Sequence, residues 1–197
     1  FMSCIQLNNP QTETYCQFKN YVLSGGFPWF WIEDTLGLDK TSDTLDSYSD
    51  LTEEQKKSGK FGTFSMFHHQ FLKRPGTPDT QTNSRLFYPV STEDDTKGIN
   101  QLLCEIFQFN NIKLNVIYRI GANSVFPQKT TISCLPHVDH EFPHKNLLIY
   151  LTDSGGDTFV EGEPFRPKED NIISFEGMHW HETPKDKRRV VLVVTYL

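Results

Sequence analysis

The chain contains 197 residues, of which 37% are hydrophobic and 22% are charged, and its formal net charge is −6. This length suits one domain, residues 1–197, with a substantial core. No run of about 18 apolar residues occurs, so neither a transmembrane helix nor a membrane partner is predicted. Basic residues are scattered apart from a short cluster at 185–189. This disfavours a nucleic-acid backbone as a partner, because such binding needs a cationic surface.

The N-terminal segment and the cysteines bear on the cellular compartment. Residues 1–7 lack the basic region and the long apolar region of a signal peptide. The cysteines show no C-x-x-C spacing, which favours free thiols over a disulfide framework or a zinc site. A reducing, cytoplasmic compartment is therefore predicted. The cysteines are Cys4, Cys16, Cys104 and Cys134.

Residues 1–111 are expected to support the domain rather than to form a second one. Apolar and aromatic side chains at helical spacing predict a helix within 11–23. The segment 25–32 indicates a turn that leads into an aromatic strand. The polar stretch 39–60 is expected to be a solvated loop, and residues 61–72 are again aromatic and β-prone.

The clearest helix is expected over 95–109, where apolar residues at i, i+3, i+4, i+7 and i+8 form one face. Short β-prone segments follow it. They lie around 113–120, 130–139, 146–152, 157–160, 171–175 and 189–196. Helices first and short strands later predict an α+β fold, with the helices packed outside an antiparallel β-sandwich.

Two segments in the C-terminal third carry the residues best suited to chemistry. The first contains His137 and Asp139; the second contains His181, with Arg189 shortly after it. Residues i and i+2 of a strand point to the same face, so His137 and Asp139 can both aim at one metal ion. Two imidazoles and one carboxylate on one face of a metal are typical of non-haem Fe(II) oxygenases.

In this order the motifs resemble those of the 2-oxoglutarate and Fe(II)-dependent oxygenase superfamily, closest to its prolyl 4-hydroxylase-like branch with small bacterial and phage members. The resemblance covers about residues 112–197. It implies a double-stranded β-helix (jelly-roll) core in that part, with residues 1–111 as support. It also implies that iron is bound by His137, Asp139 and His181.

The same resemblance assigns residues to the co-substrate. Arg189 is expected to pair with the distal carboxylate of 2-oxoglutarate, and Tyr150 to hydrogen-bond the same group. Tyr118 is a further candidate contact to 2-oxoglutarate, with core packing as the alternative. Arg188 is the alternative. We prefer Arg189 because Arg189 stands immediately before the apolar run 190–194.

The third metal ligand also has an alternative in the sequence. His179 lies two residues before His181, so both would share one face of a strand. The family pattern places a Phe six residues before the ligand and a Pro shortly after it. Phe175 and Pro184 fit that pattern for His181.

The resemblance implies a dioxygenase that hydroxylates a C–H bond while 2-oxoglutarate is decarboxylated to succinate and CO2. Its cofactors would be Fe(II), 2-oxoglutarate and O2, with ascorbate as a further candidate. A protein or peptidyl (prolyl-like) side chain is the leading substrate, and free amino acids, small metabolites and modified nucleobases are alternatives. The stretches 39–60 and 73–85 are candidates for a lid.

Two other functional classes remain open. The string His137-x-Asp139-His140 resembles part of a zinc hydrolase motif, although its leading H-x-H is absent. The other alternative is a non-catalytic jelly-roll module that has kept a metal site. The oligomeric state is not predicted.

Overall fold

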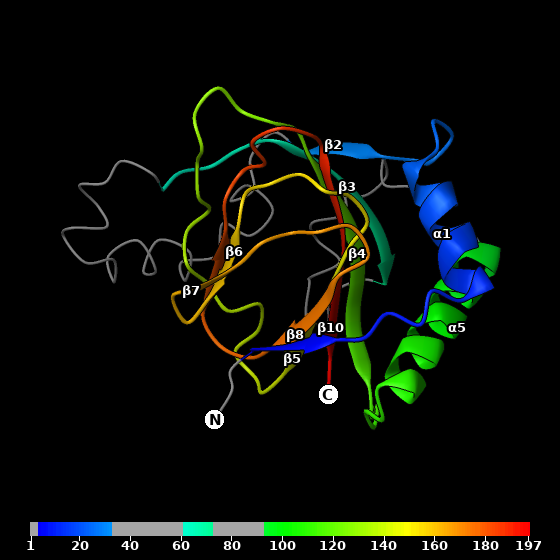
Figure 1. The fold of residues 1–197 in the computed structure, drawn as a ribbon. Coiled ribbons are helices and arrows are strands. Elements are labelled where there is room, and N and C mark those ends of the chain that lie inside the picture. The colour runs from blue at the N-terminus through cyan, green and yellow to red at the C-terminus, as the bar shows by residue number, and fades with distance from the viewer. Residues whose placement is uncertain (1–3, 33–60, 73–92) are drawn as a thin grey trace, which may run out of the picture.

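In the computed structural model, the residues described are 4–32, 61–72 and 93–197, and the remainder is the thin grey trace of Figure 1. The solvated loop predicted over 39–60 and the lid predicted over 39–60 and 73–85 lie outside the described residues. No helix in the described ranges is both long and apolar enough to cross a membrane.

The strands form two antiparallel sheets. The large sheet has the order β1-β8-β5-β10-β4-β3-β2, and the small sheet has the order β7-β6-β9. The strand bounds are β1 Cys4–Leu7, β2 Phe30–Ile32, β3 Met66–Leu72, β4 Ile117–Val125, β5 Lys145–Tyr150, β6 Thr158–Val160, β7 Glu163–Phe165, β8 Ile172–Phe175, β9 His179–His181 and β10 Arg189–Tyr196.

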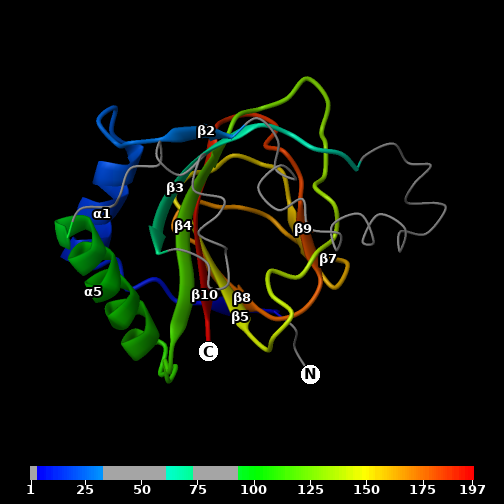
Figure 2. The same ribbon diagram turned by 180° about the vertical axis from the view of Figure 1, so that it is seen from behind.

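Two helices cover one face of the large sheet, and the small sheet lies across its other face, as both ribbon views show (Figures 1 and 2). The helices are α1 (Glu13–Leu23) and α5 (Glu93–Phe109). The α+β prediction of a double-stranded β-helix with N-terminal helices outside it is confirmed. The N-terminal part also contributes β1, β2 and β3, which extend the large sheet at both edges.

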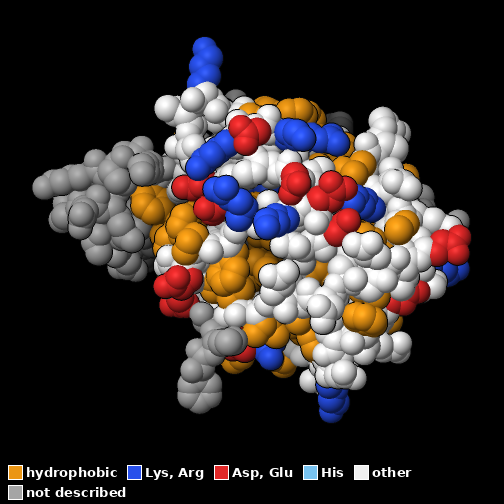
Figure 3. Space-filling model, viewed as in Figure 1, with side chains coloured by type: hydrophobic (Ala, Val, Ile, Leu, Met, Phe, Trp, Pro, Cys, Tyr) orange, Lys and Arg blue, Asp and Glu red, His pale blue; other side chains and the backbone are white. Residues whose placement is uncertain are grey.

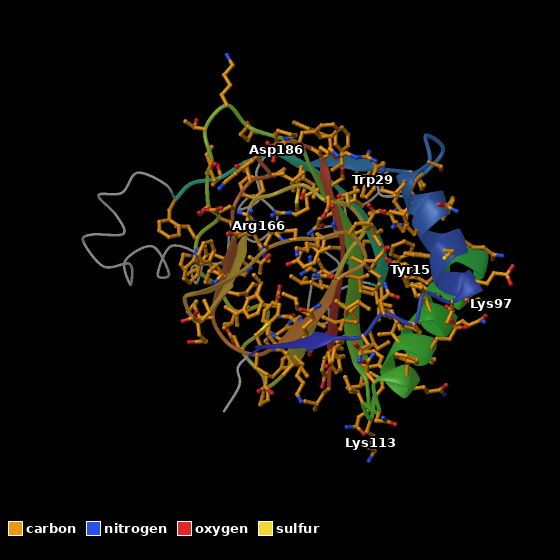
Figure 4. The ribbon with its side chains drawn as sticks, in the orientation of Figure 1. Tyr15, Trp29, Lys97, Lys113, Arg166 and Asp186 are labelled. Atoms are coloured by element: carbon orange, nitrogen blue, oxygen red, sulfur yellow. The ribbon has the colours of Figure 1, made fainter. Side chains whose placement is uncertain are left out.

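Helix α1 begins where the sequence provides a cap. The Thr12 side chain accepts a hydrogen bond from the Tyr15 backbone N–H and so satisfies a donor that the first turn leaves free. Tyr15 and Val22 then point inward and are almost fully buried, and Tyr15 lies between α1 and the sheet in Figure 4. The apolar face of α5 packs on the same core through Leu102, Leu103 and Ile106, among others.

Strand β10 is buried on both faces, which explains its uninterrupted apolar sequence. Val190, Leu192 and Val194 belong to the core beneath the helices, whereas Val191 and Val193 belong to the core between the sheets. By the same alternation, Arg189 faces the interior between the sheets.

Strand β4 differs from the strand predicted at 113–120. It extends through Gly121 and Ala122 to Val125 because it pairs with β3 on one side and β10 on the other. Gly121 is needed there: a Cβ would lie 2.8 Å from the ring of His68. Pairing within the sheet therefore outweighs the low strand propensity of these small residues.

Candidate metal centre

The backbone brings two of the candidate histidines side by side. His137 and His179 form an isolated antiparallel bridge, in which each N–H donates to the other residue's carbonyl oxygen over 3.0 Å. His179 is the first residue of β9, and His181 follows it on the same face. The segment around His137 thus adds to the open edge of the small sheet.

Three ligand-bearing side chains converge at this bridge. One ligand atom from each of His137, Asp139 and His179 can be chosen so that all three lie within 4.8 Å of one another. The His137 and His179 ring centroids are 4.4 Å apart, and Asp139 Oδ2 lies 3.5 Å from His179 Nε2. The prediction that His137 and Asp139 approach the same point agrees with this geometry.

The hydrogen bonds of both rings leave the same nitrogen free. His137 Nδ1 lies 2.8 Å from the Leu135 carbonyl oxygen, and His179 Nδ1 lies 3.3 Å from the Gly177 carbonyl oxygen. A carbonyl oxygen only accepts, so each Nδ1 carries a hydrogen, and Nε2 offers a lone pair whenever the ring is neutral. Such backbone contacts orient metal-binding imidazoles in proteins. Two imidazoles and a carboxylate that approach one another in this way fit a divalent metal once His137 has lost its second proton.

Arg119 holds the carboxylate of this group and was not singled out from the sequence. Its Nη1 donates to Asp139 Oδ1 over 3.1 Å, and the Asp139 side chain is almost fully buried. Asp139 Oδ2 is the oxygen that faces His179. A charged residue inside the β-prone stretch 117–125 was the available sequence signal. Arg119 therefore orients the carboxylate so that Oδ2 faces His179.

The two rings differ in their affinity for protons. Burial alone lowers the pKa of His137, but the Cys134 thiol, the Asp139 carboxylate and the Leu135 carbonyl outweigh burial and raise it to about 9. Burial and the neighbouring His137 lower the pKa of His179 to about 4. Without metal, the centre therefore holds its proton on His137, and a metal ion must displace that proton to bind.

His181, the predicted third ligand, lies beside this group but outside it. Its ring centroid is 5.3 Å from that of His179 and 6.3 Å from that of His137. Its Nδ1 is 2.9 Å from Thr158 Oγ1, and burial, followed by the neighbouring His179 and Arg189, lowers its pKa well below the ordinary value. The structure thus groups His179, rather than His181, with the other two ligand candidates.

Arg189 is a buried cation. It is 3% exposed, and its Nη1 donates to the carbonyl oxygens of Glu182 and Gly156 over 2.7 and 3.2 Å. Within the described part of the chain, no carboxylate forms an ion pair with it. A guanidinium stays charged even when burial lowers its pKa. Among the residues that the structure describes, its positive charge is therefore unmatched, and it suits an anionic ligand.

Arg188 and Arg189 have different surroundings. The Arg188 guanidinium is only half-buried and lies 6.0 Å from the centroid of the Phe126 ring, beyond the end of β4. Gly156 has φ +73°, and a Cβ there would lie 2.4 Å from the Thr183 carbonyl oxygen. Only glycine fits this turn, which presents the Gly156 carbonyl to Arg189.

Tyr150 and Tyr118 occupy different surroundings. Tyr150 is 1% exposed, its hydroxyl donates to Thr158 Oγ1 over 2.7 Å, and burial raises its pKa to about 12 although Arg189 opposes that shift. Tyr118 packs on Phe142 and His140, with ring centroids 4.8 and 6.3 Å away. The structure brings Tyr150 close to Arg189, whereas the role of Tyr118 stays a prediction.

Solved structures of one enzyme family resemble the chain in fold, whereas no protein-family model and no curated protein matches it. A 2OG-Fe(II) oxygenase family oxidoreductase from Burkholderia pseudomallei is 12% identical, with a TM-score of 0.42 and coverage of 98% of this chain and 93% of that one. The viral collagen prolyl hydroxylase of Paramecium bursaria Chlorella virus-1, in a 2OG complex, is 14% identical, with a TM-score of 0.44 and coverage of 87% and 98%. A Pseudomonas putida prolyl-4-hydroxylase is 11% identical, with a TM-score of 0.39 and coverage of 94% and 99%. These structures, to which the chain is similar in fold, are 2-oxoglutarate–Fe(II) oxygenases that include prolyl hydroxylases.

Proposed function

We propose that the protein is an Fe(II)- and 2-oxoglutarate-dependent dioxygenase. The observation that carries this proposal is the pairing of two features between the two sheets: a three-residue ligand group and a buried guanidinium that has no carboxylate partner among the described residues. Two imidazoles and a carboxylate suit Fe(II) and leave further coordination positions for other ligands. The guanidinium suits the far carboxylate of a dicarboxylic acid.

The metal ligands in this proposal are His137, Asp139 and His179. His179 is the third ligand in this proposal because its Nε2 lies 3.5 Å from Asp139 Oδ2, and the predicted ligand His181 is the alternative. Bound Fe(II) with 2-oxoglutarate and O2 would supply the oxidation of a substrate C–H bond, with release of succinate and CO2. Arg119 orients the Asp139 carboxylate while the metal is held.

The protein groups around the organic acid have separate tasks. Arg189 supplies the charge for the distal carboxylate, and its two bonds to backbone carbonyls fix the orientation of the guanidinium. Tyr150 is the neighbouring hydroxyl proposed for the same carboxylate, and on binding its hydrogen would turn from Thr158 Oγ1 to the acid. Both side chains are almost fully buried, so water competes little for these interactions.

The proposed substrate is a protein or peptidyl side chain with an apolar reacting carbon. Large apolar side chains next to the ligand group are exposed: Val138 by 47%, Phe142 by 37% and Met178 by 39%. Exposed apolar groups around a reactive centre favour binding of a macromolecular or apolar partner. A prolyl-like residue is the first candidate to test.

Anaerobic titration with Fe(II) and 2-oxoglutarate tests the proposal. A visible metal-to-ligand charge-transfer band, followed by succinate formation when O2 is admitted, is expected. Ester or amide cleavage supported by zinc alone would favour a hydrolase instead. Metal binding with no succinate across a panel of peptides, amino acids and nucleobases would indicate a non-catalytic module.

Figure 3 shows how charged side chains are distributed over one face of the molecule. On the face shown, Lys and Arg side chains are interspersed with Asp and Glu side chains rather than gathered into one cationic area. This face therefore gives no electrostatic attraction of the kind that a nucleic-acid backbone requires. The interspersed charges agree with the proposal of a protein or small-molecule substrate.

A further inference from the structure

Four neighbouring strands of the large sheet each place one side chain in a row on the face between the sheets. In order across the sheet, these are Phe175 of β8, Asn146 of β5, Thr195 of β10 and Arg119 of β4. Both ends of the row contact the proposed ligand group: the Phe175 ring centroid is 4.9 Å from that of His179, and Arg119 donates to Asp139. The two residues in the middle of the row therefore lie beside the ligand group.

The Asn146 carboxamide has a hydrogen-bond partner at one end only. Asn146 and Thr195 are 1% and 0% exposed, and Thr195 Oγ1 lies 3.3 Å from Asn146 Oδ1. The amide nitrogen at the other end has no partner among the described residues. Buried polar groups in proteins are nearly always hydrogen-bonded, and one without a partner destabilises the fold. A bound molecule that supplies the missing partner would remove this destabilisation.

Asn146 lies on the side of the ligand group that is remote from Arg189. Its partner Thr195 follows Arg189 by six residues in β10, which is about 20 Å along an extended strand. An organic acid held by Arg189 approaches the metal from the other end of this strand. The unpartnered end of the carboxamide is therefore placed for the substrate rather than for the acid.

The chemistry of a carboxamide indicates which group of a substrate would match it. A hydroxyl can donate or accept, so Thr195 can bind either end of the carboxamide, and the free end is then an N–H donor or a C=O acceptor. A peptide group carries one donor and one acceptor, so it satisfies both arrangements. A carboxylate only accepts, so it satisfies one of them.

We infer that Asn146 is a specificity-determining residue that hydrogen-bonds a peptide group of the substrate beside the carbon that is oxidised. The inference rests on the proposed function and names the substrate class within it: a peptide rather than a free amino acid. The carboxamide is buried in the free protein, so the contact forms when the substrate displaces the side chains that cover it.

The test uses the full chain loaded with Mn(II) and 2-oxoglutarate, so no readout depends on turnover. The probes are capped tripeptides, acetyl-Ala-X-Ala-amide with X each of the twenty amino acids, and the same amino acids in free form. Calorimetry gives the affinities for the probes, for Mn(II) and for 2-oxoglutarate. Asn146→Leu keeps the branched shape and removes the amide. Asn20→Leu is the matched control, because Asn20 is exposed on α1, across the large sheet.

The expected loss is confined to the peptide. At least one capped tripeptide binds the wild-type protein more tightly than its free amino acid does, and Asn146→Leu binds that tripeptide roughly 5- to 10-fold more weakly. Its affinities for Mn(II) and 2-oxoglutarate stay unchanged, and Asn20→Leu binds all probes like wild type. The double variant Asn146→Leu/Thr195→Val keeps the wild-type urea midpoint, because apolar groups of the same shape replace both partners.

Separate outcomes would overturn the inference or the function on which it rests. Equal peptide affinity in Asn146→Leu and wild type would show that the carboxamide does not contact the substrate. A lowered urea midpoint in the double variant, with peptide affinity unchanged, would make the pair purely structural. If no capped tripeptide binds more tightly than its free amino acid, the substrate class is wrong while the proposed function stands; if 2-oxoglutarate does not bind, the proposed function itself fails. If Asn146→Leu does not fold, Asn146→Ser provides the same comparison.

Discussion

Replacing Arg189 by Met should weaken 2-oxoglutarate binding strongly and leave the fold and the metal centre in place. The guanidinium is 3% exposed and has only backbone carbonyls as partners in the described structure. Losing those two hydrogen bonds costs about 1–3 kcal/mol each, but removing an uncompensated buried cation offsets the cost. The free energy of unfolding without ligand should therefore stay within about 2 kcal/mol of the wild-type value.

The effect on ligand binding is larger. Removing one partner of a buried charge pair costs about 2–5 kcal/mol, which weakens binding by roughly 30-fold or more. At a 2-oxoglutarate concentration of about 100 times Kd, the wild-type protein gains about 2.7 kcal/mol of stability. For a chain of this length, that gain raises Tm by about 5–10 °C. For a variant that binds 100-fold more weakly, the gain is about 0.4 kcal/mol and the rise about 1 °C.

The assay is thermal unfolding with saturating Mn(II), with and without 2-oxoglutarate. Arg188→Met is the matched control, because its guanidinium lies near Phe126 and is only half-buried. The control should keep the wild-type rise in Tm. An equal rise in Arg189→Met and wild type, or its loss in Arg188→Met alone, would refute the assignment of the buried cation.

Three further perturbations follow from the described contacts. Arg119→Met should weaken Mn(II) binding by about 10- to 100-fold, because the Asp139 carboxylate loses the contact that orients it; unchanged affinity would rule out that role. Burial lowers the pKa of His68 to about 4, so the unfolded chain takes up the proton at a higher pH than the folded chain. The free energy of unfolding should therefore fall as pH drops from about 6.5 toward 4, by at most about 3 kcal/mol. Urea unfolding at several pH values should show a weaker acid dependence in His68→Gln, and an identical dependence would contradict the assignment. Gly156→Ala should lower the free energy of unfolding by more than about 1 kcal/mol, because its φ is +73° and a Cβ would contact the Thr183 carbonyl oxygen; a stability equal to that of wild type would show that the turn can relax.

Parts of the site could be predicted from the sequence. His137 and Asp139 are two residues apart and approach the same point, although the strand predicted over 130–139 is reduced there to an isolated bridge at His137 and a bend at Asp139. Arg189 stands at the start of the apolar strand β10 and is buried there. The strand predicted at 189–196 coincides with β10 because its apolar residues are buried on both faces. In each case the local pattern and the burial in the fold agree.

The choice between His179 and His181 could not be made in this way. Both lie on one face of β9, so a period of two treats them alike. They are distinguished by the partner of Nδ1, which is a backbone carbonyl for His179 and the Thr158 hydroxyl for His181. Thr158 comes from another strand, so this difference depends on tertiary structure.

The role of Arg119 could not be predicted from the sequence for a related reason. That role depends on the contact with Asp139, twenty residues away along the chain. The predicted strand ended at Ile120, whereas β4 continues to Val125 because strands on both sides pair with it. The inward face of β4 can be recognised only once β4 is paired with β10.

The main-chain bridge between His137 and His179 sets the distance between two proposed ligands by the geometry of a β-ladder. The spacing of these imidazoles is therefore a property of the folded polypeptide and should not depend on a bound ion. In small zinc domains, by contrast, the metal drives folding. The apoprotein should accordingly behave as a rigid receptor that exchanges its ion repeatedly without passing through an unfolded state.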